Sequence, residues 1–276
     1  MANFRFTPLV PHPALQPYLA KLWIFESEGR MPEMEEKLIV PNGNFKLAFA
    51  YRNGIGTTIA GQSFTMPEYQ LTISGIIDEP VRLDPQDDIL TGTIGVEIKP
   101  LGAYRFFRLN YTELKNQILP LEELIGRKAT DLRWRMTEAV TVELKVKILQ
   151  NFLLRQLHCT ATDSIFEYCV QRIIGTHGIV SVAQLEKETG YSSRWLHNKF
   201  TDCLGTGPKN LSAIIKFGQF YDAFAAGDTP NNLKVHIYQH YHDQSHFLRA
   251  FKRFTGSTPT ELQHSLNELG TRAFRA

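Results

Sequence analysis

The chain has 276 residues, a length that suits two domains of ordinary size. Hydrophobic residues make up 43% of it and charged residues 21%, and these proportions exclude a disordered or fibrous protein. No stretch approaches the roughly 20 uninterrupted apolar residues that a membrane span needs, and residues 1–10 contain no apolar run typical of a signal peptide. We therefore expect a cytoplasmic protein without membrane contact. The net charge of +2 gives only weak support for nucleic-acid binding.

Residues 1 to about 112 are predicted to be rich in β-strands. Short apolar runs alternate there with turn signals such as Asn42-Gly43, Asn53-Gly54 and Asp84-Pro85. The runs are Lys37–Val40, Phe45–Tyr51, Thr57–Ala60, Leu71–Ile77 and Thr93–Ile98. Short strands at this spacing predict a barrel or a sandwich.

From residue 113 to about 160 the apolar residues follow helical spacing. The predicted helical segments are Glu113–Leu119, Leu121–Ile125, Asp131–Val140 and Val140–Leu157. The last segment has a wide apolar stripe, formed by Val142, Val146, Leu149, Leu153 and Leu157 with Leu144, Ile148 and Phe152 beside it. A stripe this wide must be buried, and we predict that it forms a homodimer interface. The alternative is that it packs inside the monomer, between the barrel and the C-terminal domain.

The remainder of the chain, residues 161–276, is predicted to be helical and contains a repeat. Ser192–Pro208 aligns with Asp243–Pro259 without gaps, so that Leu196 pairs with Phe247 and Phe200 with Phe251. Each copy starts at a residue that caps helices well, and each ends in a G-x-x-P exit. A short predicted helix precedes each copy, Ser181–Thr189 and Asn232–Gln239. This pattern is typical of two helix-turn-helix units, and the duplication favours it over two ordinary core helices.

The outward positions of both copies carry side chains that can read base edges in a major groove. They are Ser193, Arg194, His197 and Asn198 in the first copy, and Gln244, Ser245, His246, Arg249, Lys252 and Arg253 in the second.

This part of the chain, from Ile179 to Leu262, resembles the AraC/XylS family of transcription regulators. The strongest match runs from Asp243-Gln244-Ser245-His246-Phe247 through Phe251–Gly256 to Thr258-Pro259. The resemblance implies base contacts from Arg194, His197, Asn198, Gln244, Ser245, His246 and Arg249, and phosphate contacts from Lys216, Lys252 and Arg253. The chain departs from the family where a small Ala is usual, at Glu186 and His236, and where a Gly is usual, at His240.

The N-terminal half resembles, more loosely, the small β-rich sensor domain found ahead of some regulators of this family. The residues that carry this likeness are Pro41-Asn42-Gly43, Gly95–Pro100 and Gly102–Phe106. It implies a cupin-like barrel with a small-molecule pocket, whose ligand-binding residues we leave open. Strand aromatics such as Trp23, Phe25, Phe45 and Phe49 are candidates for its lining, although plain core is the commoner role. Arg105 and Arg108 are expected at the surface. The alternatives are that either binds an anionic ligand or pairs with a carboxylate between the domains.

Metal, cofactor and enzyme sites are not expected. His236, His240, His242 and His246 form two i, i+4 pairs, but a turn separates the pairs, and we predict surface or DNA-facing histidines. Cys159, Cys169 and Cys203 are too few and too irregularly spaced for a disulfide framework. Residues 1–157 contain only His12 as a histidine, whereas a catalytic cupin needs a histidine cluster, and nucleophile and nucleotide-binding motifs are absent.

Together these patterns predict an α+β regulator with a β-barrel-like sensor at 1–112, connecting and dimerisation helices at 113–160, and a double helix-turn-helix domain at 161–276. Its expected partners are double-stranded DNA, a second copy of the chain, a small-molecule effector and RNA polymerase. The alternative is an interaction or dimerisation module with a degenerate second unit that no longer binds DNA. A salt-dependent DNA-binding assay separates the two hypotheses.

Overall fold

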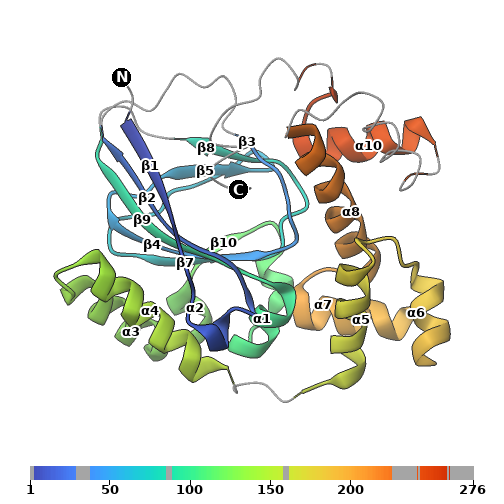
Figure 1. The fold of residues 1–276 in the computed structure, drawn as a ribbon, viewed down its shortest axis with the longest axis horizontal. Helices are drawn as coiled ribbons and strands as arrows, with labels where there is room; N and C mark the ends of the chain where they lie inside the picture. The colour runs from blue at the N-terminus through green and yellow to red at the C-terminus, as the bar shows by residue number, and fades with distance from the viewer. Residues whose placement is uncertain are drawn as a thin grey trace.

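The computed structural model describes residues 3–28, 38–84, 89–157, 162–225, 241, 243–259 and 261. Cys159 and the first helix predicted for the second unit, Asn232–Gln239 with His236, lie outside the described residues, as do His240 and His242. Within the described residues, two sheets with a few short helices make up the N-terminal half, and helices make up the C-terminal third (Figure 1). The predicted α+β fold class is confirmed.

Two antiparallel sheets form the N-terminal half. The larger has the order β1 (Asn3–Leu9), β2 (Leu19–Glu28), β9 (Thr91–Ile98), β4 (Phe45–Arg52), β7 (Leu71–Ser74), β10 (Ile118–Pro120). The smaller has the order β3 (Leu38–Ile39), β8 (Val81–Asp84), β5 (Gly56–Ile59), β6 (Gln62–Phe64). The sheets face each other and enclose a cavity lined from both sides, as a barrel-like domain requires.

Close backbone packing fixes the centre of the larger sheet. All of β9 is buried, and its Gly95 lies under the indole of Trp23. A Cβ at position 95 would be 2.0 Å from Trp23 Cζ2, so only glycine fits there. The sheet also extends beyond residue 112, where we expected it to end. The segment Glu113–Leu119, predicted to be helical, instead leaves the short 3-10 helix η2 (Tyr111–Leu114) and enters β10. This segment has too few apolar residues for their spacing to distinguish the period of a helix from the period of a strand.

Helices cover the outer face of the larger sheet (Figure 1). They are η1 (Pro13–Leu15), α1 (Pro100–Phe106), α2 (Leu121–Ile125), α3 (Arg127–Glu138) and α4 (Val142–Gln156). The predicted stripe of α4 is largely internal, since Val146, Leu149 and Leu153 are buried within the single chain. The stripe is therefore core of the monomer, but it packs chiefly on η1, α1 and α3, whereas the alternative placed it between the barrel and the C-terminal domain. Homodimerisation stays a prediction, without the support of this stripe.

The C-terminal third contains α5 (Ser164–Gly175), α6 (Val182–Thr189), α7 (Ser193–Leu204), α8 (Pro208–Ala225) and α10 (Gln244–Thr255). The repeat is α7 and α10. Ser192 accepts a hydrogen bond from the backbone N–H of Trp195 at 3.3 Å, and Asp243 accepts one from that of His246 at 2.7 Å. Both helices end at a glycine in the left-handed conformation, Gly205 and Gly256. The predicted caps and exits are confirmed.

The barrel and the helical third share one continuous hydrophobic core. At their contact Tyr104 packs edge-on against Phe166, with ring centroids 4.9 Å apart. Arg105, which we expected at the surface, instead forms an ion pair of 2.9 Å with Glu167 of α5, and both side chains are largely buried. A buried guanidinium needs a partner, and Arg105 has the one named as an alternative, a carboxylate between the domains.

Gly205 offers a test of this docking, because its α-carbon lies against the barrel half. A Cβ at Gly205 would be 2.1 Å from the carbonyl oxygen of Tyr111, whereas nothing lies within 4 Å of a Cβ at Gly190, the left-handed cap of α6. We expect Gly190→Ala to lower the free energy of unfolding by about 1 kcal/mol through backbone strain alone. Gly205→Ala should lower the free energy of unfolding by at least about 1 kcal/mol more, because its Cβ also clashes with the carbonyl oxygen of Tyr111. Urea denaturation of the full chain measures both; equal losses would mean that the two halves do not dock this way.

Candidate nucleic-acid interface and barrel cavity

The outward faces of α7 and α10 are exposed, as the repeat predicts. Their inward faces are buried through Leu196 and Phe200 in α7, and through Phe247, Phe251 and Phe254 in α10. The exposed candidates are Arg194, His197, Asn198, Gln244, Ser245, His246, Arg249, Lys252 and Arg253. Lys216 is different, because it lies half-buried on α8 with its amine 5.0 Å from the ring centroid of Tyr241. Burial lowers the pKa of the Lys216 amine.

Four of these candidates meet in one cleft of about 720 Å³ between the helical third and the barrel half. They are His197 of α7 and His246, Arg249 and Arg253 of α10. Lys209 of α8 and Asp78 and Lys115 of the barrel half line the same cleft. The structure thus brings together residues from both copies, while Arg194, Asn198, Gln244, Ser245 and Lys252 lie outside the cleft lining.

Asp78 anchors one end of this cleft. Its carboxylate, 4% exposed, accepts hydrogen bonds from Asn116 Nδ2 at 2.7 Å, Asn210 Nδ2 at 2.8 Å and Arg253 Nη2 at 2.7 Å. Burial by itself would raise the pKa of Asp78, but the hydrogen bonds from the two amides and the charges of Arg253 and Lys115 outweigh it and hold the pKa below its usual value. The carboxylate is therefore ionised at neutral pH.

Arg253 has partners in this structure that the sequence did not predict. We expected it to contact a phosphate, and the structure places its guanidinium on Asp78 and on Asn210 Oδ1, each at 2.7 Å. The pairing joins α10 to the barrel half across 175 positions of sequence. No local pattern indicates such a partner.

Glu186 contacts the start of α7. It stands where the resembled family usually has a small Ala, and its carboxylate accepts a hydrogen bond from the backbone N–H of Ser193 in the first turn of α7. An acidic group at a helix N-terminus is favourable, so this departure stabilises the start of the first candidate recognition helix. The corresponding departures in the second unit, His236 and His240, lie outside the described residues.

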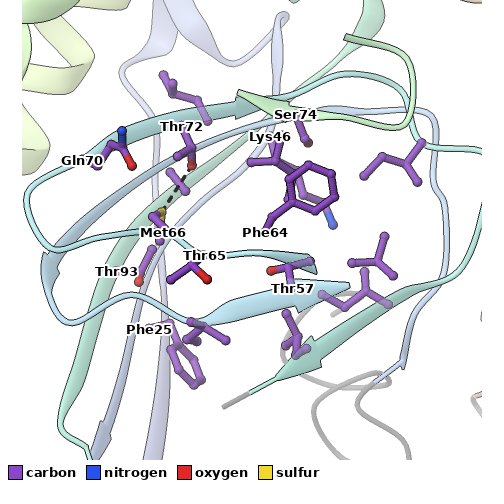
Figure 2. A pocket seen from close by; sticks show the side chains of 18 of the residues that line it. Phe25, Lys46, Thr57, Phe64, Thr65, Met66, Gln70, Thr72, Ser74 and Thr93 are labelled. Carbon is purple, nitrogen blue, oxygen red and sulfur yellow. Dashed lines mark hydrogen bonds between the residues drawn. The ribbon is translucent and has the colours of Figure 1, made fainter. Parts of the chain in front are cut away.

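The barrel encloses a cavity of about 370 Å³ (Figure 2). Its walls are mainly apolar and include Trp23 and Phe25 of the predicted aromatics, whereas Phe45 and Phe49 lie in the hydrophobic core that the barrel shares with the helical third. Sequence reasoning missed its polar lining, which includes Lys46, Thr72, Ser74 and Thr93. The sequence does place Thr72 and Ser74 on one face of their strand, because they alternate with buried apolar residues. This alternation does not show that the sheet face they share lines a cavity.

Neither a metal site nor a membrane helix emerges from the described residues. Within them no group of three or more His, Cys, Asp or Glu side chains is arranged to hold a metal ion. No helix in the described part of the chain is long and apolar enough to cross a membrane.

Comparison with known proteins gives one family match and several structural likenesses. Residues 7–120, less than half of the chain, match a family model described as a domain of unknown function, DUF6597. No curated protein matches the chain.

Among solved structures, ToxT from Vibrio cholerae strain SCE256 with an unsaturated fatty acid bound is 13% identical with a TM-score of 0.47, over 89% of this chain and 95% of that chain. ToxT from Vibrio cholerae O395 is 13% identical with a TM-score of 0.45, over 96% of this chain and 98% of that one. A cupin domain of an XRE family transcriptional regulator from Enterobacter cloacae is 11% identical with a TM-score of 0.28, over 34% of this chain and 94% of that one. Likeness at this level assigns neither a DNA site nor a ligand to the chain.

Proposed function

We propose that the chain is a sequence-specific DNA-binding transcription regulator, with α7 and α10 as its recognition helices and double-stranded DNA as its partner. The duplicated helix carries this proposal. In both copies a side-chain cap, a buried apolar face and a left-handed glycine fix the helix, while the outward face stays exposed. Arg, Asn, Gln, Ser and His on such a face match the hydrogen-bonding edges of bases in a major groove.

The exposed side chains of α7 and α10 differ in whether they suit base edges or phosphates. Arg249 and Asn198 suit base edges, because guanidinium and amide groups can each pair with one purine through two hydrogen bonds. Lys252, which lies outside the cleft, suits a phosphate. Two helices that enter successive major-groove faces would be spaced by about one helical turn, roughly 34 Å.

The barrel supplies the sensor in this proposal, since its cavity lies within the size range of small-molecule sites. Homodimerisation and contact with RNA polymerase stay predictions. Light scattering of the full chain at tens of micromolar checks the first, and a monomer would exclude a dimeric regulator.

A second candidate function is favoured by one observation. Arg253 is held by Asp78, and other candidate residues of α10 line a cleft against the barrel half, an arrangement that also suits a module whose helices contact protein. In that case the chain would act through an interaction surface and would not bind DNA.

Salt dependence decides between the two. The full chain is first used to select duplexes from a random pool, and its affinity for the best duplex is then measured over a range of salt concentrations. A DNA-binding regulator should lose affinity log-linearly with salt, with a slope of about −0.9 for each phosphate contacted. A flat response, or no selected duplex, would leave the interaction module.

Lys252→Ala sharpens this test. We expect it to weaken binding to every sequence about equally and to reduce the salt slope by about 1, because it removes one phosphate contact. Lys128→Ala on α3 is the matched control, since Lys128 is an exposed cation on the helices that cover the opposite side of the barrel (Figure 1). Equal slopes for the two variants would remove Lys252 from the DNA contact.

A further inference from the structure

We infer that the barrel cavity binds a mainly apolar molecule carrying a hydrogen-bond-accepting oxygen, and that its occupancy weakens the contact between Asp78 and Arg253 on α10. This inference rests on the proposed function for its meaning in the cell, but its test does not use DNA.

The cavity wall carries buried hydroxyl groups. Ser74 and Thr93 line the cavity and are only 5% and 3% exposed. Among the residues that the structure describes, neither Ser74 Oγ nor Thr93 Oγ1 has a hydrogen-bond partner. A buried hydroxyl without a partner is costly, so a ligand that offers an acceptor to either group regains that free energy. Ser74 pairs with Lys46 and Thr93 pairs with Ala50, four residues further along β4, so the two hydroxyls lie apart on the wall (Figure 2). One acceptor oxygen of the ligand therefore meets one of the two hydroxyls.

The remaining wall is mainly aromatic and aliphatic. Trp23, Phe25 and Phe64 contribute aromatic surface, and Ile77 and Ile118 contribute aliphatic surface. Figure 2 shows Phe25 and Phe64 on the same cavity as the hydroxyls of Ser74 and Thr93. A wall that is apolar apart from a few polar groups recognises a ligand mostly by its apolar body and orients it by the polar ones. An aromatic body with one carbonyl or carboxylate oxygen fits this description.

The cavity wall is directly connected to Asp78. Ile77, which lines the cavity, immediately precedes Asp78, and Ile118 lies two residues after Asn116. The backbone N–H of Asp78 donates to Asn116 Oδ1 at 2.9 Å, and Asn116 Nδ2 donates to Asp78 Oδ1 at 2.7 Å. The two segments that close this side of the cavity are therefore tied together at the residue that holds Arg253.

The same wall touches α10 a second time. Val81 lines the cavity, and a Cβ at Gly256, the residue that ends α10, would lie 3.4 Å from Cγ of the neighbouring Pro80. A ligand body that presses Ile77 and Val81 outward thus acts on both contacts between the barrel wall and α10. Packed interfaces answer such shifts by changing between discrete arrangements, because they are not continuously deformable.

Asp78 keeps Arg253 from contacting a DNA phosphate. In the present arrangement the Asp78 carboxylate and a DNA phosphate would compete for the same guanidinium, and the two anions would repel each other. Weakening of the contact makes Arg253 available. Because coupling between two equilibria is reciprocal, loss of the Asp78–Arg253 contact must in turn strengthen ligand binding.

The experiment measures probe binding to the full chain by calorimetry. Phenylbutanoic acid, its methyl ester and butylbenzene share one apolar body and offer a carboxylate, a neutral acceptor and no acceptor. We expect the acid and the ester to bind more tightly than butylbenzene. Thr93→Val and Ser74→Ala each remove one of the two hydroxyls, and one of these variants should weaken the binding of acid and ester about threefold to tenfold while leaving butylbenzene unchanged. Failure of all three probes to bind, or an equal effect on all three in both variants, overturns the ligand class.

The coupling has its own variants. Arg253→Ala should raise the affinity for the acid or the ester by about fivefold or more. Lys187→Ala is the matched control, since it removes an exposed cation of α6 outside the Asp78 contact. Equal affinities for these two variants overturn the coupling, whatever the chain does with DNA. If Arg253→Ala tightens probe binding and the chain selects no duplex, the coupling stands and the proposed function falls.

Discussion

Phe251→Ala should lower the free energy of unfolding of the full chain by about 3–5 kcal/mol, the usual loss when a fully buried Phe is truncated. Phe251 is fully buried at the centre of an aromatic cluster. Its ring lies 5.6 Å from that of Phe217, 5.8 Å from that of Phe224 and 5.8 Å from that of Phe247, each in an edge-on arrangement. Truncation removes these contacts and leaves a cavity between α8 and α10.

Leu248→Ala on the same helix is the matched control, because Leu248 is 41% exposed. It should lose less than about 1 kcal/mol. Urea denaturation is performed on the full chain, since the continuous core means that an isolated fragment 161–276 would expose its contact with the barrel. A loss below about 1 kcal/mol for Phe251→Ala as well would place the apolar face of α10 in solvent and contradict the alignment of the repeat.

Arg249→Ala should weaken specific DNA binding by about 1–3 kcal/mol, or roughly fivefold to 150-fold, and relax the preference for one base pair of the selected duplex. Arg249 is exposed on α10 between the buried Phe247 and Phe251, so its removal leaves the packing of the helix intact. The melting temperature should stay close to that of the parent. Fixed salt is essential, because the phosphate contribution would otherwise mask the loss of one base contact.

Arg127→Ala on α3 controls for the loss of one positive charge, since the side chain of Arg127 is 93% exposed. It should bind the selected duplex like the parent. If Arg249→Ala also keeps the affinity and the base preference of the parent, α10 does not read bases through this residue. The proposal would then have to rest on α7 or give way to the interaction module.

The sequence by itself determined the repeat and its details. Ser192 and Asp243 cap their helices, Phe200 and Phe251 are buried, and Gly205 and Gly256 end the helices in the left-handed conformation. These features were predictable because each depends on residues within one or two helical turns. Capping, apolar spacing and left-handed glycines are all local properties of the backbone.

The tertiary structure decided what each buried face and each charge would contact. The apolar stripe of α4 predicted burial correctly but not its partner, because an amphipathic helix packs equally well on its own domain or on a second copy. Arg253 and Asp78 meet across 175 positions, and Arg105 and Glu167 across 62. The hydroxyls of Ser74 and Thr93 belong to one cavity only because the two sheets curve around it. Ion pairs and cavities of this kind are set by how separate elements dock, and periodicity within an element carries no information about docking.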